Sequence, residues 1–176
     1  MGLEKPVDPA LLADMLAARE ERWNRRLALC GKARTVLSLT LCLPLPFRRE
    51  SFWRSLLGQK SRELETYLTE AGTGLRGRES LSGADGDAYF FLSDADPAQL
   101  KRLCVAFEEQ ADGRVLDADV MSGGEAVGRS ELGLSPRKCF LCGRPAAECV
   151  SRGVHDSGEV AAWVRERERC LSLNFR

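Results

Sequence analysis

The sequence predicts an α+β protein with a ferredoxin-like β-α-β-β-α-β core, in which helices lie on one face of a mainly antiparallel sheet. Three observations favour this class. Apolar residues alternate with polar ones over residues 35–43, and they recur at helical spacing after Ser51 and after Pro97. The remaining short strands fall in the order that this core requires. With 176 residues, we expect one domain, comprising an α+β core over 8–134 and a Cys/His loop with a C-terminal helix over 135–176.

The first predicted element is a helix over residues 9–30. Asp8 is a good N-cap and Pro9 suits the first helical position, while Gly31 suits the end. One face of this helix carries the apolar residues Leu12, Met15, Leu16, Trp23 and Leu27. We therefore expect that face to pack inward.

A half-buried strand is predicted over residues 35–43, because its leucines alternate on one face until Pro44 and Pro46 stop it. A second helix follows over 51–71, and Gly72 ends it. The later strands are predicted over 75–82, 88–92, 115–121 and 126–129, and the later helices begin at Pro97 and Gly158. Gly123-Gly124 would form a hairpin turn that puts Asp119 opposite Gly128 and Ala118 opposite Arg129.

Composition excludes several function classes. The chain has 26 basic and 26 acidic residues, and this balance argues against non-specific nucleic-acid binding. The longest apolar stretch, 36–47, is interrupted by polar residues and prolines, so no membrane span is predicted. Residues 1–6 lack the charged-then-apolar pattern of a signal sequence, and we expect a cytoplasmic protein.

A pair of carboxylates is the first candidate for chemistry. Asp117 and Asp119 are two apart on a predicted strand and so point to the same face, where they repel each other unless a cation lies between them. Magnesium is the cation that such pairs hold in many phosphoryl and nucleotidyl transferases. The nearby basic residues Arg114, Arg129, Arg137 and Lys138 suit phosphate binding. The alternative is a solvated strand face without a metal.

A cluster of thiols and one imidazole is the second candidate. Among the seven cysteines, Cys139, Cys142 and Cys149 lie close together, and His155 is the only histidine. Three thiolates and an imidazole form a complete tetrahedral zinc set, which is typical of a structural site. The alternative is a group of free thiols on a loop. The other cysteines in apolar segments, Cys30, Cys42 and Cys104, are expected to be buried and inert.

These stretches together resemble the holo-citrate lyase synthase family, also called apo-citrate lyase phosphoribosyl-dephospho-CoA transferase. The resemblance rests on residues 113–120, on 135–142, on the Ala-Ala-Glu-Cys of 146–149 and on His155, and it covers about residues 10–168. It extends upstream to the helix around Arg19–Arg22 and to the strand that ends in Pro44-x-Pro46.

The resemblance implies an enzyme that moves a phosphoribosyl-dephospho-CoA group from triphosphoribosyl-dephospho-CoA to a serine of the citrate lyase acyl carrier subunit. Diphosphate would be released. It implies that Asp117 and Asp119 hold magnesium and act at the reacting phosphorus, while Arg114, Arg129 and Arg137 clamp phosphates. The nucleophile would belong to the carrier subunit.

Two other functions stay open at this point. The first is the related transferase that loads the carrier subunit of malonate decarboxylase with the same group. The second is a zinc-stabilised binding module without enzymatic activity, in which the aspartates are merely solvated.

Overall fold

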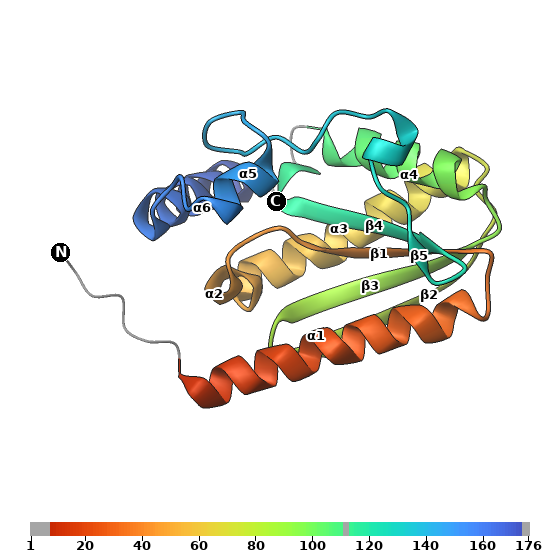
Figure 1. Ribbon diagram of the computed structural model, residues 1–176, viewed down its shortest axis with the longest axis horizontal. Coiled ribbons are helices and arrows are strands. Elements are labelled where there is room, and N and C mark those ends of the chain that lie inside the picture. The colour runs from red at the N-terminus through yellow and green to blue at the C-terminus, as the bar shows by residue number, and fades with distance from the viewer. Residues whose placement is uncertain (1–7, 111–112, 174–176) are drawn as a thin grey trace.

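A computed structural model describes residues 8–110 and 113–173, and it shows a five-stranded antiparallel sheet with helices on both faces (Figure 1). The helices are α1 (Pro9–Cys30), α2 (Leu45–Arg48), α3 (Ser51–Glu70), α4 (Pro97–Glu108), α5 (Ala146–Ser151) and α6 (Ser157–Ser172). The strands are β1 (Thr35–Leu41), β2 (Leu75–Gly83), β3 (Gly86–Ser93), β4 (Leu116–Ser122) and β5 (Glu125–Ala126). The α+β class is confirmed, and the predicted long elements agree with these bounds to within about two residues. The helices α2 and α5 were not predicted.

The sheet has the strand order β2-β3-β1-β4-β5, so β1 is its central strand. Leu37 of β1 lies opposite Phe91 of β3 on one side and opposite Val120 of β4 on the other. The leucines of β1 pack with Trp53 of α3 and Leu100 of α4 in the larger core. The two core helices therefore cover one face, as predicted.

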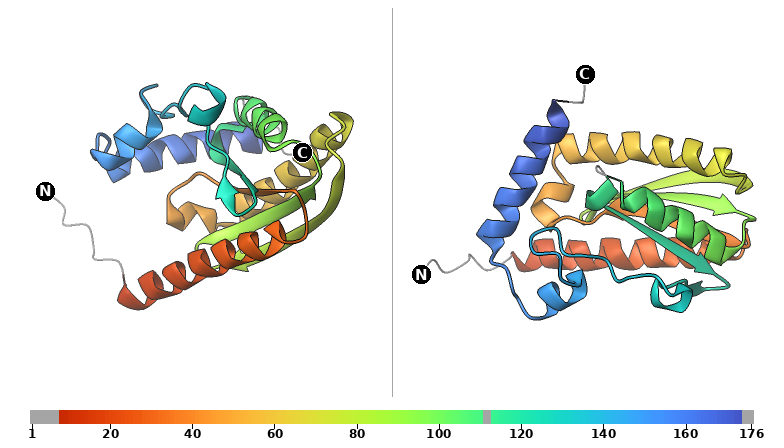
Figure 2. Two further views of the ribbon diagram at one scale, coloured as in Figure 1. Left: turned by 45° about the vertical axis from the view of Figure 1, so that its right-hand side comes forward. Right: turned by 90° about the horizontal axis from the view of Figure 1, so that it is seen from above.

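The other face of β1 is covered as well, which corrects the prediction of a half-buried strand. Val36 packs with Ala88 and Phe90 of β3 and with Leu29 of α1 in a second, smaller core. The further views show α1 on the opposite side of the sheet from α3 and α4 (Figure 2). The helices of the predicted core, α3 and α4, thus share one face, and the N-terminal helix α1, which lies outside that core, covers the other.

The orientation of α1 about its own axis also differs from the prediction. Leu12, Leu16, Trp23 and Leu27, which were expected to pack inward, are between 39% and 55% exposed. The side of α1 that faces the sheet carries Ala18 and Leu29 together with two arginines, Arg22 and Arg26. Two carboxylates lie opposite this side of α1 and form ion pairs with its arginines: Asp85 in the turn between β2 and β3, and Asp119 on β4.

The hairpin after β4 is shorter than predicted. Gly123 and Gly124 form the turn with φ values of 59° and 86°, which glycine adopts without strain. In the returning segment Glu125 and Ala126 pair with β4, the N–H of Val127 donates to the carbonyl of Val120 at 2.8 Å, and the chain then leaves the sheet. The N–H of Gly128 donates to the Glu131 side chain at 3.2 Å and not to a strand. The predicted return strand over 126–129 is therefore present but shorter, and its pairing of Gly128 with Asp119 is wrong. Among the described residues, no strand lies beside the outer edge of β4 at 116–119.

The C-terminal segment is attached to the rest of the chain through apolar contacts. Val164 and Leu171 of α6 are buried in the larger core, and Phe140 stacks on Trp163 with ring centroids 4.1 Å apart. Asp156 caps α6 by accepting from the N–H of Glu159 at 2.8 Å. In Figure 1, α5 and α6 lie together near the beginning of β4.

Within the described part of the chain, none of the helices is both long and apolar enough to cross a membrane. The expectation of a cytoplasmic protein rests on residues 1–6, which lie outside the described residues.

Candidate functional site

The two aspartates of β4 lie on the face of the sheet that α1 covers. Asp117 is opposite Thr40 of β1, and Asp119 is opposite Ser38. Ala118, between them, is buried in the core on the other face. The side chains of Asp117 and Asp119 remain 41% and 48% exposed, so a ligand from solvent has access to both.

Each aspartate lies beside one arginine from a different part of the chain. The Arg137 guanidinium is 3.0 Å from the Asp117 carboxylate, and the Arg26 guanidinium is 3.6 Å from the Asp119 carboxylate. Burial raises the pKa of Asp119, and the neighbouring Asp117 raises it further, against the opposing effect of Arg26. The negative charge of the pair is thus incompletely balanced. Carboxylate oxygens are the ligands that magnesium prefers, so this donor set fits a divalent cation.

The edge of β4 is closed by side chains of α4. Glu108, which is only 4% exposed, accepts a hydrogen bond from the N–H of Ala118 at 2.6 Å. Lys101 is also buried, and it donates to the carbonyl of Ala118 at 2.8 Å. The N–H and the carbonyl of Ala118 thus bond to side chains of α4, where in the interior of a sheet they would bond to a neighbouring strand.

Glu108 also organises two of the predicted phosphate-binding residues. Its carboxylate contacts Arg129 and Arg137, each at 2.5 Å. Arg137 therefore joins Glu108 to Asp117. Sequence reasoning missed Glu108, although a signal was present: Lys101 and Glu108 are seven residues apart and share a helix face with the apolar Cys104.

A pocket of about 360 Å³ lies at this edge of the sheet. Its lining consists of Glu108, Glu109, Arg114, Arg129, Ser135, Pro136, Arg137 and Lys138. The structure thus brings all four predicted basic residues around one cavity, and Arg137 connects that cavity to Asp117.

Like Arg137, the arginines Arg129 and Arg114 also have protein partners. Arg129 contacts Glu109 at 3.2 Å in addition to Glu108, and it donates to the carbonyl of Ser135 at 3.4 Å. Arg114 donates to the carbonyl of Cys139 at 3.3 Å. The contacts of Arg129 fix the loop that leads to Arg137. The hydrogen bond from Arg114 connects this pocket to the cysteine cluster.

We expect the stability of the protein to depend on Glu108. Glu108→Ala leaves the Ala118 N–H without its acceptor and two arginines without their shared carboxylate, so the free energy of unfolding should fall by about 3 kcal/mol. Glu108→Gln retains an acceptor and should cost less. Chemical denaturation of both variants measures this. The exposed Glu109→Ala is the matched control, and an equal loss in this control would contradict the assignment.

Cys42 lies closer to the aspartates than expected. The side chain is half-buried beside Arg137 and Asp117, and burial raises the pKa of its thiol, with Arg137 opposing this effect. The thiol therefore stays protonated. Cys30 is also half-buried, whereas Cys104 is buried as predicted.

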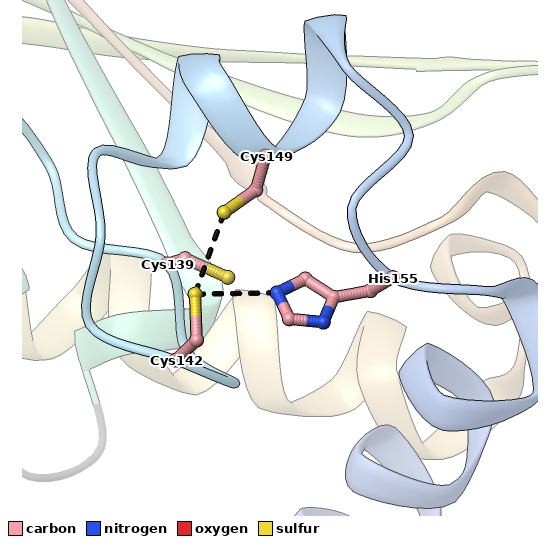
Figure 3. A group of neighbouring side chains, drawn as sticks. All are labelled: Cys139, Cys142, Cys149 and His155. Carbon is pink, nitrogen blue, oxygen red and sulfur yellow. Dashed lines mark hydrogen bonds between the residues drawn. The ribbon is translucent and has the colours of Figure 1, made fainter.

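The three cysteines and the histidine of the second candidate site come together in space (Figure 3). Their ligand atoms all lie within 4.8 Å of one another. The Cys142 sulfur is 3.5 Å from the Cys149 sulfur and 3.3 Å from Nε2 of His155. This group could hold a metal ion such as zinc.

Local backbone structure builds this cluster from three segments. Cys139 donates its N–H to the carbonyl of Arg144 at 2.6 Å, which folds the intervening residues into a tight loop that carries Cys142. Cys149 lies on α5, and His155 comes just before α6. The backbone of Arg144, together with the side chains of His155, Cys149 and Cys139, lowers the pKa of Cys142 to about 7 through hydrogen bonds to its sulfur. A thiolate is the form that binds a metal ion.

Comparisons with known proteins agree with the resemblance. A family model described as apo-citrate lyase phosphoribosyl-dephospho-CoA transferase matches residues 10–169. A protein of that name from Citrobacter koseri is 29% identical over 147 residues, which are 82% of this chain and 80% of the relative. A probable enzyme of the same name from Streptococcus pyogenes serotype M3 is 30% identical over 156 residues, or 85% of this chain and 80% of the relative.

A longer relative also matches. The protein CitXG of Leuconostoc mesenteroides subsp. cremoris is 28% identical over 153 residues. These residues are 84% of this chain but only 32% of that relative. This chain thus corresponds to about a third of the longer protein.

Proposed function

The chain belongs to the apo-citrate lyase phosphoribosyl-dephospho-CoA transferase family, and we propose that Asp117 and Asp119 form the centre of its activity. The protein is a transferase that attaches the phosphoribosyl-dephospho-CoA group to apo-citrate lyase. The observation that carries the site is the position of the two carboxylates, which share one accessible sheet face beside a cavity lined with arginines.

The donor of the group is triphosphoribosyl-dephospho-CoA, and the acceptor is a serine hydroxyl of the acyl carrier subunit. The serine oxygen forms a bond to the phosphorus nearest the ribose, and the bond from that phosphorus to the remaining diphosphate breaks. The serine proton passes to a base or to water. This chain has to hold a polyanion in line with the incoming oxygen, and it supplies no nucleophile of its own.

Asp117 and Asp119 would hold magnesium. When bound, the ion supplies positive charge for the departing diphosphate. The donor set supports this, because two accessible carboxylates lie on one face of the sheet and repel each other unless a cation binds between them. Arg137 lies between the pocket and Asp117, so it is placed to orient a phosphate group there.

Two finer statements about the structure belong to the same proposal. The order β2-β3-β1-β4 within the antiparallel sheet supports a ferredoxin-like core, to which β5 is added. The Cys139 cluster is proposed as a structural zinc site, because four protein ligands leave no open position for a substrate.

Transfer in a purified system tests the function. The protein is mixed with the donor, magnesium and either the citrate lyase carrier subunit or the malonate decarboxylase carrier subunit. We expect diphosphate release and a mass increase on the citrate lyase carrier, with none when the carrier is omitted. Modification of the malonate decarboxylase carrier alone would favour the alternative transferase. Absence of transfer to either carrier would contradict the proposed function.

A further inference from the structure

The side of α1 that faces the sheet carries two arginines one turn apart, and their surroundings differ. The Arg22 and Arg26 side chains are only 17% and 12% exposed. Arg22 lies 2.5 Å from the carboxylate of Asp85, a residue that is only 2% exposed, and this close pair accounts for its position. Among the residues that the structure describes, Arg26 has no comparably close partner, since the Asp119 carboxylate is 3.6 Å away.

One N–H donor of Arg26 has no acceptor among the described residues. This donor is the Nε atom, which is buried. A guanidinium has five N–H donors, and a buried donor without an acceptor is unfavourable. A ligand oxygen near Asp119 would be within reach of the terminal N–H groups of the same guanidinium, one of which lies 3.6 Å from the Asp119 carboxylate.

Trp23 holds Arg26 from the outer side. The Arg26 guanidinium lies 5.6 Å from the centre of the Trp23 ring, within the range of a cation–π contact. The Trp23 side chain is itself 46% exposed. Arg26 thus lies between an indole at the surface and the carboxylate at which we place the metal ion.

We propose that Arg26 binds the triphosphate of the donor and that it serves as the counter-ion of Asp119 while the site is empty. This inference rests on the proposed function of Asp117 and Asp119. Arg26 approaches the carboxylates from α1, whereas Arg137 approaches from the opposite segment that follows β5. A polyphosphate at the carboxylates would be contacted from both sides.

This arrangement couples the binding of a cation at Asp119 to the binding of a phosphate at Arg26. In the empty protein the positive charge of Arg26 opposes a cation at Asp119. Once a cation binds there, Arg26 no longer has Asp119 as its counter-ion and can bind a phosphate oxygen. Removal of Arg26 should therefore change the two affinities in opposite directions, which a purely structural ion pair would not do.

The test uses Arg26→Gln and measures binding by calorimetry, first with Mn²⁺ alone as the metal probe and then with inorganic tripolyphosphate in the presence of magnesium. We expect Mn²⁺ to bind several-fold more tightly and tripolyphosphate about tenfold more weakly than in the natural protein. The Michaelis constant for the donor should rise while turnover changes less. Arg26→Lys keeps the charge but not the planar fork, so its tripolyphosphate affinity should fall between the two.

Arg25→Gln is the matched control, because it removes the same charge from the next residue of α1. Arg25 is exposed and pairs with Glu79 of β2, away from the aspartates. Both affinities should stay within about twofold in this control. Unchanged tripolyphosphate binding in Arg26→Gln, or weaker binding of both probes, would overturn the inference. The melting temperature of each variant is measured in parallel to show that it is folded. The effect of Asp119→Asn on transfer tests the proposed function of the aspartates separately from the role of Arg26.

Discussion

Replacing either aspartate of β4 with asparagine should reduce the rate of group transfer at least about 100-fold. Asparagine keeps the size of the side chain but removes the negative charge that would hold the cation. Asp117 and Asp119 supply the two carboxylates of this face. Loss of either one therefore leaves the cation with a single carboxylate ligand. Steady-state transfer to the carrier subunit, followed by mass spectrometry, measures the loss. Extra magnesium should partly restore the less affected variant.

The same variants should remain folded. The side chains of Asp117 and Asp119 are nearly half exposed, and exposed ion pairs contribute at most about 1 kcal/mol. Asp94→Asn serves as the control, because Asp94 is similarly exposed and pairs with Arg76 on another part of the sheet. Transfer at the natural rate by both Asp117→Asn and Asp119→Asn would show that the aspartates are not the catalytic centre.

The elements of the fold were predictable because local signals for them are strong. Asp8 and Asp96 cap helices that begin with proline, and both contacts are present, at 3.0 Å to the N–H groups of Ala10 and Ala98. The juxtaposition of Cys139 with His155 was predictable for a different reason, since ligand chemistry restricts such residues to few arrangements.

The side of α1 that faces the sheet could not be read from its apolar pattern. The apolar stripe through Leu16 and Trp23 predicts that this face packs inward. The surface that α1 contacts, however, carries Asp85 and Asp119 as well as apolar residues. The side that faces inward forms ion pairs with these two carboxylates, and a helical pattern contains no information about such partners. This is why Arg26 was not among the predicted site residues.

The edge of β4 was mispredicted for a similar reason. The glycine turn correctly predicts a hairpin, yet the return strand ends after Ala126. The backbone of β4 is instead satisfied by Glu108 and by Arg137, which donates to the carbonyl of Leu116 at 2.7 Å. The buried Glu108 carboxylate accepts the hydrogen bond that a neighbouring strand would otherwise accept. Because this contact joins residues on separate elements, the pocket at this edge was not predictable from local sequence.

Removing a metal ion from the cysteine cluster should have the largest effect on stability. Cys139 and Cys149 are only 7% and 5% exposed, so their thiolates would be poorly solvated without a cation. Zinc at about a thousandfold above its dissociation constant adds about 4 kcal/mol to the folded state. For a chain of this size that corresponds to a shift in melting temperature of roughly 10 °C.

The purified protein should therefore contain about one zinc ion per chain, and a strong chelator should lower its melting temperature by roughly this amount. Cys142→Ser should behave like chelation, whereas Cys30→Ser, which alters a thiol outside the cluster, should not. The fluorescence of Trp163 should change as well, because Phe140 stacks on it from the loop that carries Cys142. Zinc-free protein with an unchanged melting temperature, and with full transfer activity once magnesium is restored, would contradict a structural zinc site while leaving the transferase assignment intact. Loss of transfer that added magnesium does not restore, in zinc-free protein that is still folded at the assay temperature, would instead connect the cluster to the pocket through Arg114, which donates to the carbonyl of Cys139.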